Sequence, residues 1–347
     1  MKARELMRAG WLLLLLVALR VADAQHHATD DAEARYAPTP PVLYPGGVRS
    51  LRDVTYAEPL GYRPLTLDLY LPPEGVAKRP VVVFIHGGAW RSRTARDGGA
   101  FRDFPAALAS VAARNYVVAS VNYRFSKEAR FPAAVQDVAQ AIRWLRAHAD
   151  RYGIDTDKFV AWGSSAGGQI AAVLGTACGV AAFEPPSGGG SLEDAAIRQR
   201  TVQTTATPSV CVQGVIDWYG LVDLESDGKD LGKLDVPDYV KTYLGCELSQ
   251  CPSGWARSAS PFPYIDGKDP PFLIQHGAAD VTVSPAQSKR LYDALHAAGV
   301  PAELVIYPGV AHGFAKVPGG GPDDAVNKQA MDKVFEYLGR YFPSGAR

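Results

Sequence analysis

Apolar segments of strand length alternate with segments of helix length over most of this 347-residue chain. Val81–Ile85 is an uninterrupted run of β-branched and aromatic residues, which favours a central strand buried on both faces. Phe131–Arg151 spaces its apolar residues three and four positions apart, which predicts an amphipathic helix. Strands and helices in alternation predict an α/β domain at residues 51–347, with a mostly parallel central sheet and helices on both faces.

Weaker patterns predict the rest of this domain. The strict alternation of Leu65–Tyr70 suits an edge or half-buried strand. Residues 183–208 read as an exposed loop, and residues 221–261 as a small lid insertion above the carboxyl edge of the sheet. The other expected strands are Tyr116–Val121, Phe159–Gly163, Val212–Trp218, Pro271–Gln275 and Glu303–Tyr307, and the other expected helices are Phe101–Ala113, Ala166–Cys178, Ser284–Ala298 and Asp324–Phe342.

The N-terminal residues have the composition of an export signal. Basic residues precede an apolar run from Trp11 to Leu19, and the small residues of Ala22–Ala24 follow it. This predicts a signal peptide at residues 1–24 rather than a membrane anchor, because a membrane span needs about 20 apolar residues. Residues 25–50 are rich in Ala, Pro and Thr and are expected to be a flexible leader. The mature protein is therefore expected in the periplasm or outside the cell.

The charge balance argues against several classes of partner. The chain has 36 basic and 36 acidic residues, so its formal net charge is zero. Proteins that bind nucleic acid or an acidic membrane surface usually have an excess of positive charge, and this sequence has none. No further stretch is long and apolar enough to span a membrane once the signal peptide is removed.

The cysteines are expected to form disulfides, because their number is even and the predicted compartment is oxidising. Cys246 and Cys251 lie five positions apart in a polar stretch, which favours a local bridge and leaves Cys178 to pair with Cys211. A zinc site would need closer pairs with neighbouring histidines, and the sequence has none, so no metal is expected.

Gly163–Gly167 reads Gly-Ser-Ser-Ala-Gly and lies between a predicted strand and a predicted helix. In the G-x-S-x-G pattern the central serine occupies a sharp turn that lifts its hydroxyl to the top of the sheet. Ser165 is therefore the candidate nucleophile. A phosphate-binding turn is the alternative, but this loop has no lysine.

The glycine pair after the Val81–Ile85 strand is a candidate oxyanion hole. In His86–Trp90, Gly87 and Gly88 leave backbone N–H groups free to point at a developing negative charge, together with the N–H of Ala166.

A serine nucleophile needs a base, and the base needs a carboxylate that orients it. His312 follows the nucleophile and the acid candidates in the order Ser, Asp, His. Asp280 follows the preceding strand and is favoured over Asp217 and Asp223 as the carboxylate. His86 and His276 directly end strands, so they are expected to brace loops through hydrogen bonds.

Further motifs accompany these candidates, and together they resemble serine esterases of the α/β-hydrolase superfamily, of the hormone-sensitive-lipase-like and BD-FAE (feruloyl-esterase-like) branch. The resemblance implies an α/β-hydrolase fold, a triad of Ser165, Asp280 and His312, and no cofactor. It also implies an oxyanion hole formed by Gly87, Gly88 and Ala166. The motifs are His86–Trp90, Ile142–Arg146, Tyr152–Asp155, Gly163–Gly168, Val215–Gly220, Ala259–Pro261, His276–Asp280 and His312–Phe314.

The expected activity is that of an exported serine carboxylic-ester hydrolase that works through an acyl-enzyme. Its substrate would be a small-molecule or polysaccharide-linked ester, with a short acyl group or with a plant-derived sugar or phenolic part. Trp90, Trp218 and Tyr219 follow or end strands near the site and are candidates for the pocket wall, although aromatic residues also fill cores. Two alternatives stay open, an amide hydrolase of the same fold (an arylformamidase or a peptidase) and a catalytically dead binding protein.

Overall fold

A mixed sheet forms the centre of the molecule in the computed structural model, which describes residues 40–345 except 74, 76–77, 187–206, 226–236 and 318–319. Residues from Pro41 on belong to one compact unit. The predicted signal peptide, the leader up to residue 39 and most of the 183–208 loop lie outside the described residues.

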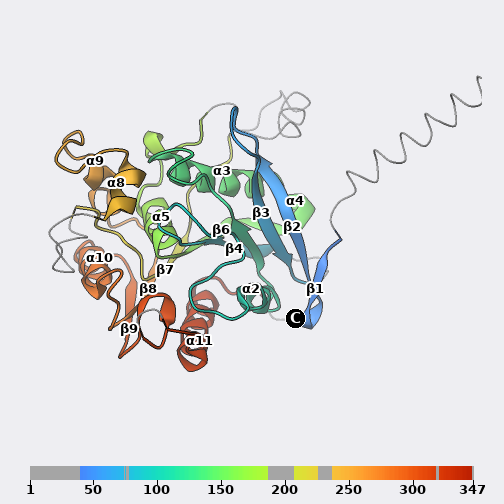
Figure 1. Ribbon diagram of the computed structural model, residues 1–347. Coiled ribbons are helices and arrows are strands. Elements are labelled where there is room, and N and C mark those ends of the chain that lie inside the picture. The colour runs from blue at the N-terminus through green and yellow to red at the C-terminus, as the bar shows by residue number, and fades with distance from the viewer. Residues whose placement is uncertain are drawn as a thin grey trace, which may run out of the picture. The chain divides into compact units, whose positions relative to one another are not determined.

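The described strands form one nine-stranded sheet (Figure 1). The first three strands along the chain pair antiparallel, as does Leu65–Leu71 with Val117–Val121, and all other neighbours in the sheet are parallel. This confirms the predicted α/β class with a mostly parallel sheet. In spatial order the strands are β1 (Val42–Tyr44), β2 (Val48–Ala57), β3 (Leu65–Leu71), β5 (Val117–Val121), β4 (Arg79–Ile85), β6 (Ile154–Ser164), β7 (Gly214–Trp218), β8 (Phe272–Gly277) and β9 (Ala302–Tyr307).

Helices cover both faces of this sheet, as predicted (Figure 1). Successive residues of β4 point to opposite faces, so Val83 packs in the core beneath one set of helices and Phe84 in the core beneath the other. Helices α3 (Ala133–Ala147), α5 (Ala166–Thr176) and α10 (Pro285–Ala297) contribute to the first core, and α2 (Phe104–Ala112) and α11 (Asp324–Tyr341) to the second. The shorter helices are α4 (Ala149–Tyr152), α8 (Asp238–Leu244) and α9 (Trp255–Ser258), with 3₁₀ turns at Pro45–Gly47, Ala181–Phe183, Phe262–Tyr264 and His312–Phe314.

The strand register gathers four loops at one edge of the sheet. Ile85 pairs with Gly163, Ser164 with Trp218, and Gly277 with Tyr307. Parallel strands end at the same edge, so the loops after β4, β6, β8 and β9 converge there. These four loops carry the candidate nucleophile, base and carboxylate and the two glycine donors. In the described part of the chain, no helix is both long and apolar enough to cross a bilayer.

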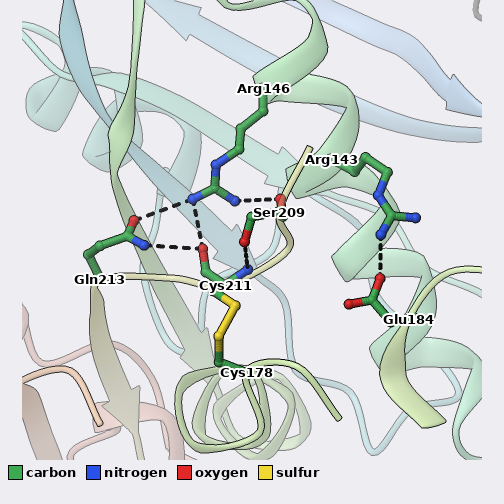
Figure 2. Close-up of a disulfide and its surroundings, with 7 residues drawn as sticks. All are labelled: Arg143, Arg146, Cys178, Glu184, Ser209, Cys211 and Gln213. Carbon is green, nitrogen blue, oxygen red and sulfur yellow. Dashed lines mark hydrogen bonds and ion pairs between the residues drawn. A yellow bond between two sulfur atoms is a disulfide. The ribbon is translucent and has the colours of Figure 1, made fainter. Parts of the chain in front are cut away.

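Two disulfides close the chain in the predicted pairs, Cys178 with Cys211 and Cys246 with Cys251. Figure 2 shows the first of them, between the end of α5 and the segment that leads into β7. The guanidinium of Arg146 on α3 donates to the carbonyl oxygens of Ser209 and Cys211, each at 2.7 Å. This contact ties the disulfide-bonded segment to a helix on the same face of the sheet.

The antiparallel edge corrects two predictions. The leader was expected to extend to residue 50, but residues 42–44 and 48–50 already pair within β1 and β2. β2 pairs with the outer side of β3, so β3 is not an edge strand. Leu67 and Leu69 are fully buried in the core that α3 covers, so β3 is not half-buried either. The pairing of β2 with β3 is broken by shifts in register, which blurs the alternation that would reveal a strand.

Candidate active site

Ser165 occupies the turn between β6 and α5 in a strained backbone conformation. Its φ of 55° and ψ of −118° lie in a region that non-glycine residues rarely adopt. The turn is tight enough that a Cβ at Gly163 would lie 2.0 Å from the Gly167 carbonyl oxygen. A Cβ at Gly167 would in turn lie 2.0 Å from the Ile85 carbonyl oxygen. Both glycines of the motif are therefore required by close backbone contacts.

The structure brings Ser165, His312 and Asp280 together. His312 Nε2 lies 3.1 Å from Ser165 Oγ, and His312 Nδ1 lies 2.6 Å from Asp280 Oδ2. A carboxylate oxygen can only accept, so Nδ1 carries the proton and the neutral ring presents Nε2 as an acceptor to the Ser165 hydroxyl. This is the protonation state in which a histidine can act as a general base.

Asp280 is buried but stays ionised. Burial alone would raise the pKa of its carboxyl group, but hydrogen bonds from His276 and His312 lower it well below its usual range. The backbone N–H groups of Thr282 and Val283 also donate to Oδ1, at 2.8 and 2.9 Å. Asp280 can therefore orient the His312 ring and stabilise its charged form.

The two rival carboxylates lie elsewhere. Asp217 is fully buried at the end of β7. Two glycines pack closely against its carboxylate, since a Cβ added at Gly168 or Gly220 would lie only 2.2 or 2.3 Å from Oδ1. Burial raises the pKa of Asp217 to about 7. Asp223 pairs with Arg290, whose Nε lies 3.2 Å from its Oδ2. Neither aspartate has a hydrogen bond or ion pair with His312 among the described contacts.

His86 and His276 brace loops through hydrogen bonds, as the sequence predicted. His86 Nδ1 donates to the Gly87 carbonyl at 2.8 Å, and the Tyr123 hydroxyl donates to the His86 carbonyl at 2.9 Å. Burial lowers the pKa of His86 to about 4, so its ring is neutral near neutral pH. One ring nitrogen of His276 contacts the Asp280 carboxylate, and the other contacts the Ser288 hydroxyl.

The predicted oxyanion donors lie in the loop after β4 and at the first residue of α5. A Cβ at Gly87 would lie 3.1 Å from Ser165 Cβ, so the glycine loop packs directly against the serine. Among the described residues, neither the Gly87 N–H nor the Gly88 N–H donates to another backbone carbonyl. The N–H of Ala166 belongs to the first turn of α5, where N–H groups have no partner within the helix. In the described part of the chain, these three N–H groups therefore have no backbone acceptor, which leaves them available to an anion beside the serine.

A pocket of about 610 Å³ opens beside Ser165 and His312. Of the three aromatic residues predicted to form its wall, only Tyr219 does so. Its other lining residues include Gly87, Gly88, Arg91, Arg93, Phe101, Ser164, Thr282, Gly313, Ala315, Gly320 and Pro322.

The predictions for Trp90 and Trp218 were wrong, because both side chains are buried supports. Trp90 stacks on Tyr243, with ring centroids 4.2 Å apart, and its Nε1 donates to Gln169 Oε1. Trp218 is fully buried and stacks on Phe101 at 5.6 Å. Neither indole lines the pocket, because Trp90 stacks on the buried ring of Tyr243 and Trp218 stacks on Phe101, which itself lines the pocket.

The wall of the pocket differs from the predicted lid. No described residue of the 237–261 stretch lines the pocket, although Tyr239 approaches it, with its ring 5.8 Å from Cζ of Arg91. The segment after His312 lines it instead, held by a β-bridge between Ala315 and Pro322. The sequence signal for this segment is its run of glycine and proline, which is typical of loops and does not by itself indicate a pocket wall.

Comparison with known proteins supports the esterase resemblance. The BD-FAE family model matches residues 67–295, and the dienelactone hydrolase family model matches residues 254–342. Esterase LipC of Mycobacterium tuberculosis is 28% identical over 243 residues, covering 69% of this chain and 54% of LipC. The Arabidopsis thaliana isoprenylcysteine alpha-carbonyl methylesterase ICME is 28% identical over 253 residues, covering 71% of this chain and 53% of ICME. The chain thus spans about half the length of these curated relatives.

Solved structures show the same α/β-hydrolase fold over most of the chain. The propionate-bound esterase Est2 of Thermogutta terrifontis has a TM-score of 0.64 and 26% identity, covering 84% of this chain and 96% of Est2. A truncated carbohydrate esterase from gut microbiota has a TM-score of 0.61 and 28% identity, covering 83% of this chain and 95% of that one. The BD-FAE model matches well over half of the sequence, so the chain belongs to the BD-FAE family.

Proposed function

We propose that this protein is a serine carboxylic-ester hydrolase with Ser165, His312 and Asp280 as its catalytic triad. The observation that carries the proposal is the unbroken series of contacts from Asp280 Oδ2 through His312 to Ser165 Oγ. The unpaired N–H groups of the glycine loop next to the serine support it, and so do relatives that are named as esterases.

In the proposed mechanism, Ser165 Oγ attacks the ester carbonyl carbon while His312 Nε2 takes the hydroxyl proton. The negative charge that develops on the carbonyl oxygen is bound by the N–H groups of Gly87, Gly88 and Ala166. His312 then gives its proton to the leaving alcohol, and the acyl group stays on Ser165. Water, activated by His312, releases the acid and restores the serine.

The proposed substrates are esters of short acyl chains, including esters of sugars or phenolics. A pocket of about 610 Å³ suits a small ligand. The solved Est2 structures are described as propionate-bound and butyrate-bound, and the gut relative as a carbohydrate esterase. Export to an oxidising compartment is part of the proposal, and the two disulfides fit it.

Labelling with a fluorophosphonate probe tests the proposal and separates an enzyme from a dead binding protein. The probe should modify the wild-type protein on Ser165 and abolish hydrolysis of 4-nitrophenyl acetate. Ser165→Ala should stay unlabelled and lose roughly 10⁴-fold or more in kcat. The matched control is Ser110→Ala, because the Ser110 hydroxyl donates to the Ala107 carbonyl within α2, outside the site. A folded Ser165→Ala protein that keeps most of its esterase activity would refute the assignment.

A further inference from the structure

The pocket beside Ser165 has an unbalanced positive charge. Arg91 and Arg93 line it, and no aspartate or glutamate is among its described lining residues. Within the described part of the chain, neither guanidinium has an ion pair. The guanidinium of Arg91 contacts the ring of Tyr239, with Cζ 5.8 Å from the ring centroid. A concave site with charges of one sign focuses its potential on whatever enters.

Other arginines of this region, in contrast, form ion pairs with carboxylates. Arg96, three residues after Arg93, lies with its Nε 2.7 Å from the buried Asp68 carboxylate and its Nη2 2.8 Å from Asp53. The Nη2 of Arg124 lies 2.7 Å from Asp137. Arginines that support this part of the fold are therefore neutralised by carboxylates, whereas the two that face the pocket are not.

The loop that carries Arg93 has a defined shape. The Arg91 N–H donates to the Gly88 carbonyl at 3.0 Å, and the Ser92 hydroxyl donates to the same oxygen at 3.1 Å. Arg93 itself has a φ of +77°, which a non-glycine residue adopts only when its surroundings impose it. The backbone of Arg93 is thus fixed next to the glycine loop that packs on Ser165.

A second polar group faces the same space. The Tyr219 hydroxyl is buried in the pocket wall and has no hydrogen bond of normal geometry with a described residue. The Tyr219 ring packs edge-on against His312, with centroids 5.0 Å apart. Burial raises the pKa of Tyr219 well above its usual range. The nearby charge of Arg93 and the Ser164 hydroxyl oppose that rise, and the carboxylates of Asp280 and Asp217 add to it. Tyr219 therefore keeps its proton and can donate it in a hydrogen bond.

We propose that Arg93 and Tyr219 form a subsite for a carboxylate on the substrate, so that the pocket prefers esters bearing a negative charge beyond the scissile bond. The proposal rests on the proposed esterase function. The Arg93 guanidinium would bind the carboxylate through paired N–H donors, and the Tyr219 hydroxyl would add a third. Arg91 adds to the positive potential at the mouth of the pocket.

Two matched pairs of esters test this preference and locate the charge. In the first pair, 4-nitrophenyl hemiadipate carries a carboxylate on the acyl side, and 4-nitrophenyl hexanoate is its uncharged counterpart. In the second, 3-acetoxybenzoate carries it on the alcohol side, and 3-acetoxybenzamide is uncharged. The wild-type enzyme should have a kcat/KM at least roughly fivefold higher for the charged member of one pair, and added salt should reduce that ratio.

Single substitutions test whether Arg93 and Tyr219 cause the preference for the charged ester. Arg93→Gln should lower the charged-to-uncharged ratio of kcat/KM roughly tenfold, and Tyr219→Phe roughly threefold. Arg340→Gln removes the same charge from α11, where Arg340 faces Glu303, and should leave the ratio as it is. Circular dichroism and thermal melts confirm that each variant is folded.

The outcomes distinguish this proposal from the one on which it rests. Active enzyme with no preference in either pair would overturn the carboxylate subsite alone. So would equal losses of preference in Arg93→Gln and Arg340→Gln, since a general charge effect would then explain them. Absence of turnover on every ester, including 4-nitrophenyl acetate, would overturn the proposed function and the subsite together.

Discussion

The buried side chain of His276 lies with its Nε2 3.1 Å from Oδ2 of Asp280, the same oxygen that contacts His312. Nε2 also lies 3.1 Å from the Val283 carbonyl oxygen. Both neighbours of Nε2 are acceptors, so this nitrogen carries the proton, and in the neutral ring Nδ1 accepts from the Ser288 hydroxyl at 2.7 Å. His276 therefore fixes the rotation of the carboxylate that orients His312.

The first prediction concerns this positioning role. His276→Gln should lower kcat roughly tenfold and change KM little, because a misplaced carboxylate weakens the base in the transition state more than it affects binding. Ser288→Ala should have a smaller effect, since its hydroxyl contacts only the distal nitrogen of His276. Steady-state kinetics with 4-nitrophenyl acetate check both variants. An unchanged kcat in folded His276→Gln would show that Asp280 needs no such support.

The second prediction uses the buried carboxyl of Asp217. Burial raises its pKa to about 7, whereas in the unfolded chain it titrates near its ordinary value of about 4. Between these values the unfolded state loses its proton first, so Asp217 makes the folded protein less stable as pH rises from about 4 to about 7. Below about pH 4 Asp217 does not lower the free energy of unfolding, and above about pH 7 the amount by which it lowers this free energy stays constant. Each pKa unit of difference corresponds to about 1.4 kcal/mol.

Asp217→Asn removes this titration while keeping the shape of the side chain. The variant should gain stability relative to the wild type when the pH is raised from about 5 to about 8. Urea unfolding at both values of pH gives the two free energies of unfolding that have to be compared. If the free energies of unfolding of variant and wild type differ by the same amount at both pH values, then Asp217 does not titrate in this range.

The sequence carried strong signals for the residues nearest the proposed chemistry. Ser165 lies in a motif whose strand and helix neighbours make its geometry recognisable, and parallel strands must end at one edge. His312 and Asp280 follow two such strands, so the topology alone brings them toward the serine. The placement of these three residues was therefore predictable before any contact was known.

The pocket wall was less predictable, for physical reasons. An aromatic residue near the end of a strand can point into the core or into the site. Trp218 and Tyr219 are adjacent, yet Trp218 is part of the core and Tyr219 lines the pocket. The charged wall depends on Arg93, whose neighbour Tyr219 is more than a hundred positions away in the sequence. Such a long-range pairing leaves no local pattern, so it became visible only in the folded chain.

The third prediction compares the two disulfides. The bridge between Cys178 and Cys211 spans 33 positions, and the one between Cys246 and Cys251 spans five. In the loop-closure model the longer loop is worth about 3–4 kcal/mol and the shorter about 2 kcal/mol. The double variant Cys178→Ser with Cys211→Ser should therefore lower Tm more than Cys246→Ser with Cys251→Ser does. Thermal melts of both check the order, and the reverse order would contradict the loop-closure account.

The last prediction concerns the length of the acyl chain. Each methylene group that fits the pocket can contribute about 0.8 kcal/mol of burial, and each one that stays in water contributes nothing. The pocket of about 610 Å³ has to hold the alcohol part of the ester as well as its acyl chain, so we expect the benefit to end after a few carbons. Across 4-nitrophenyl esters from acetate to palmitate, kcat/KM should peak at the short members and fall as the chain outgrows the pocket. A maximum at about ten carbons or beyond would instead indicate a lipase.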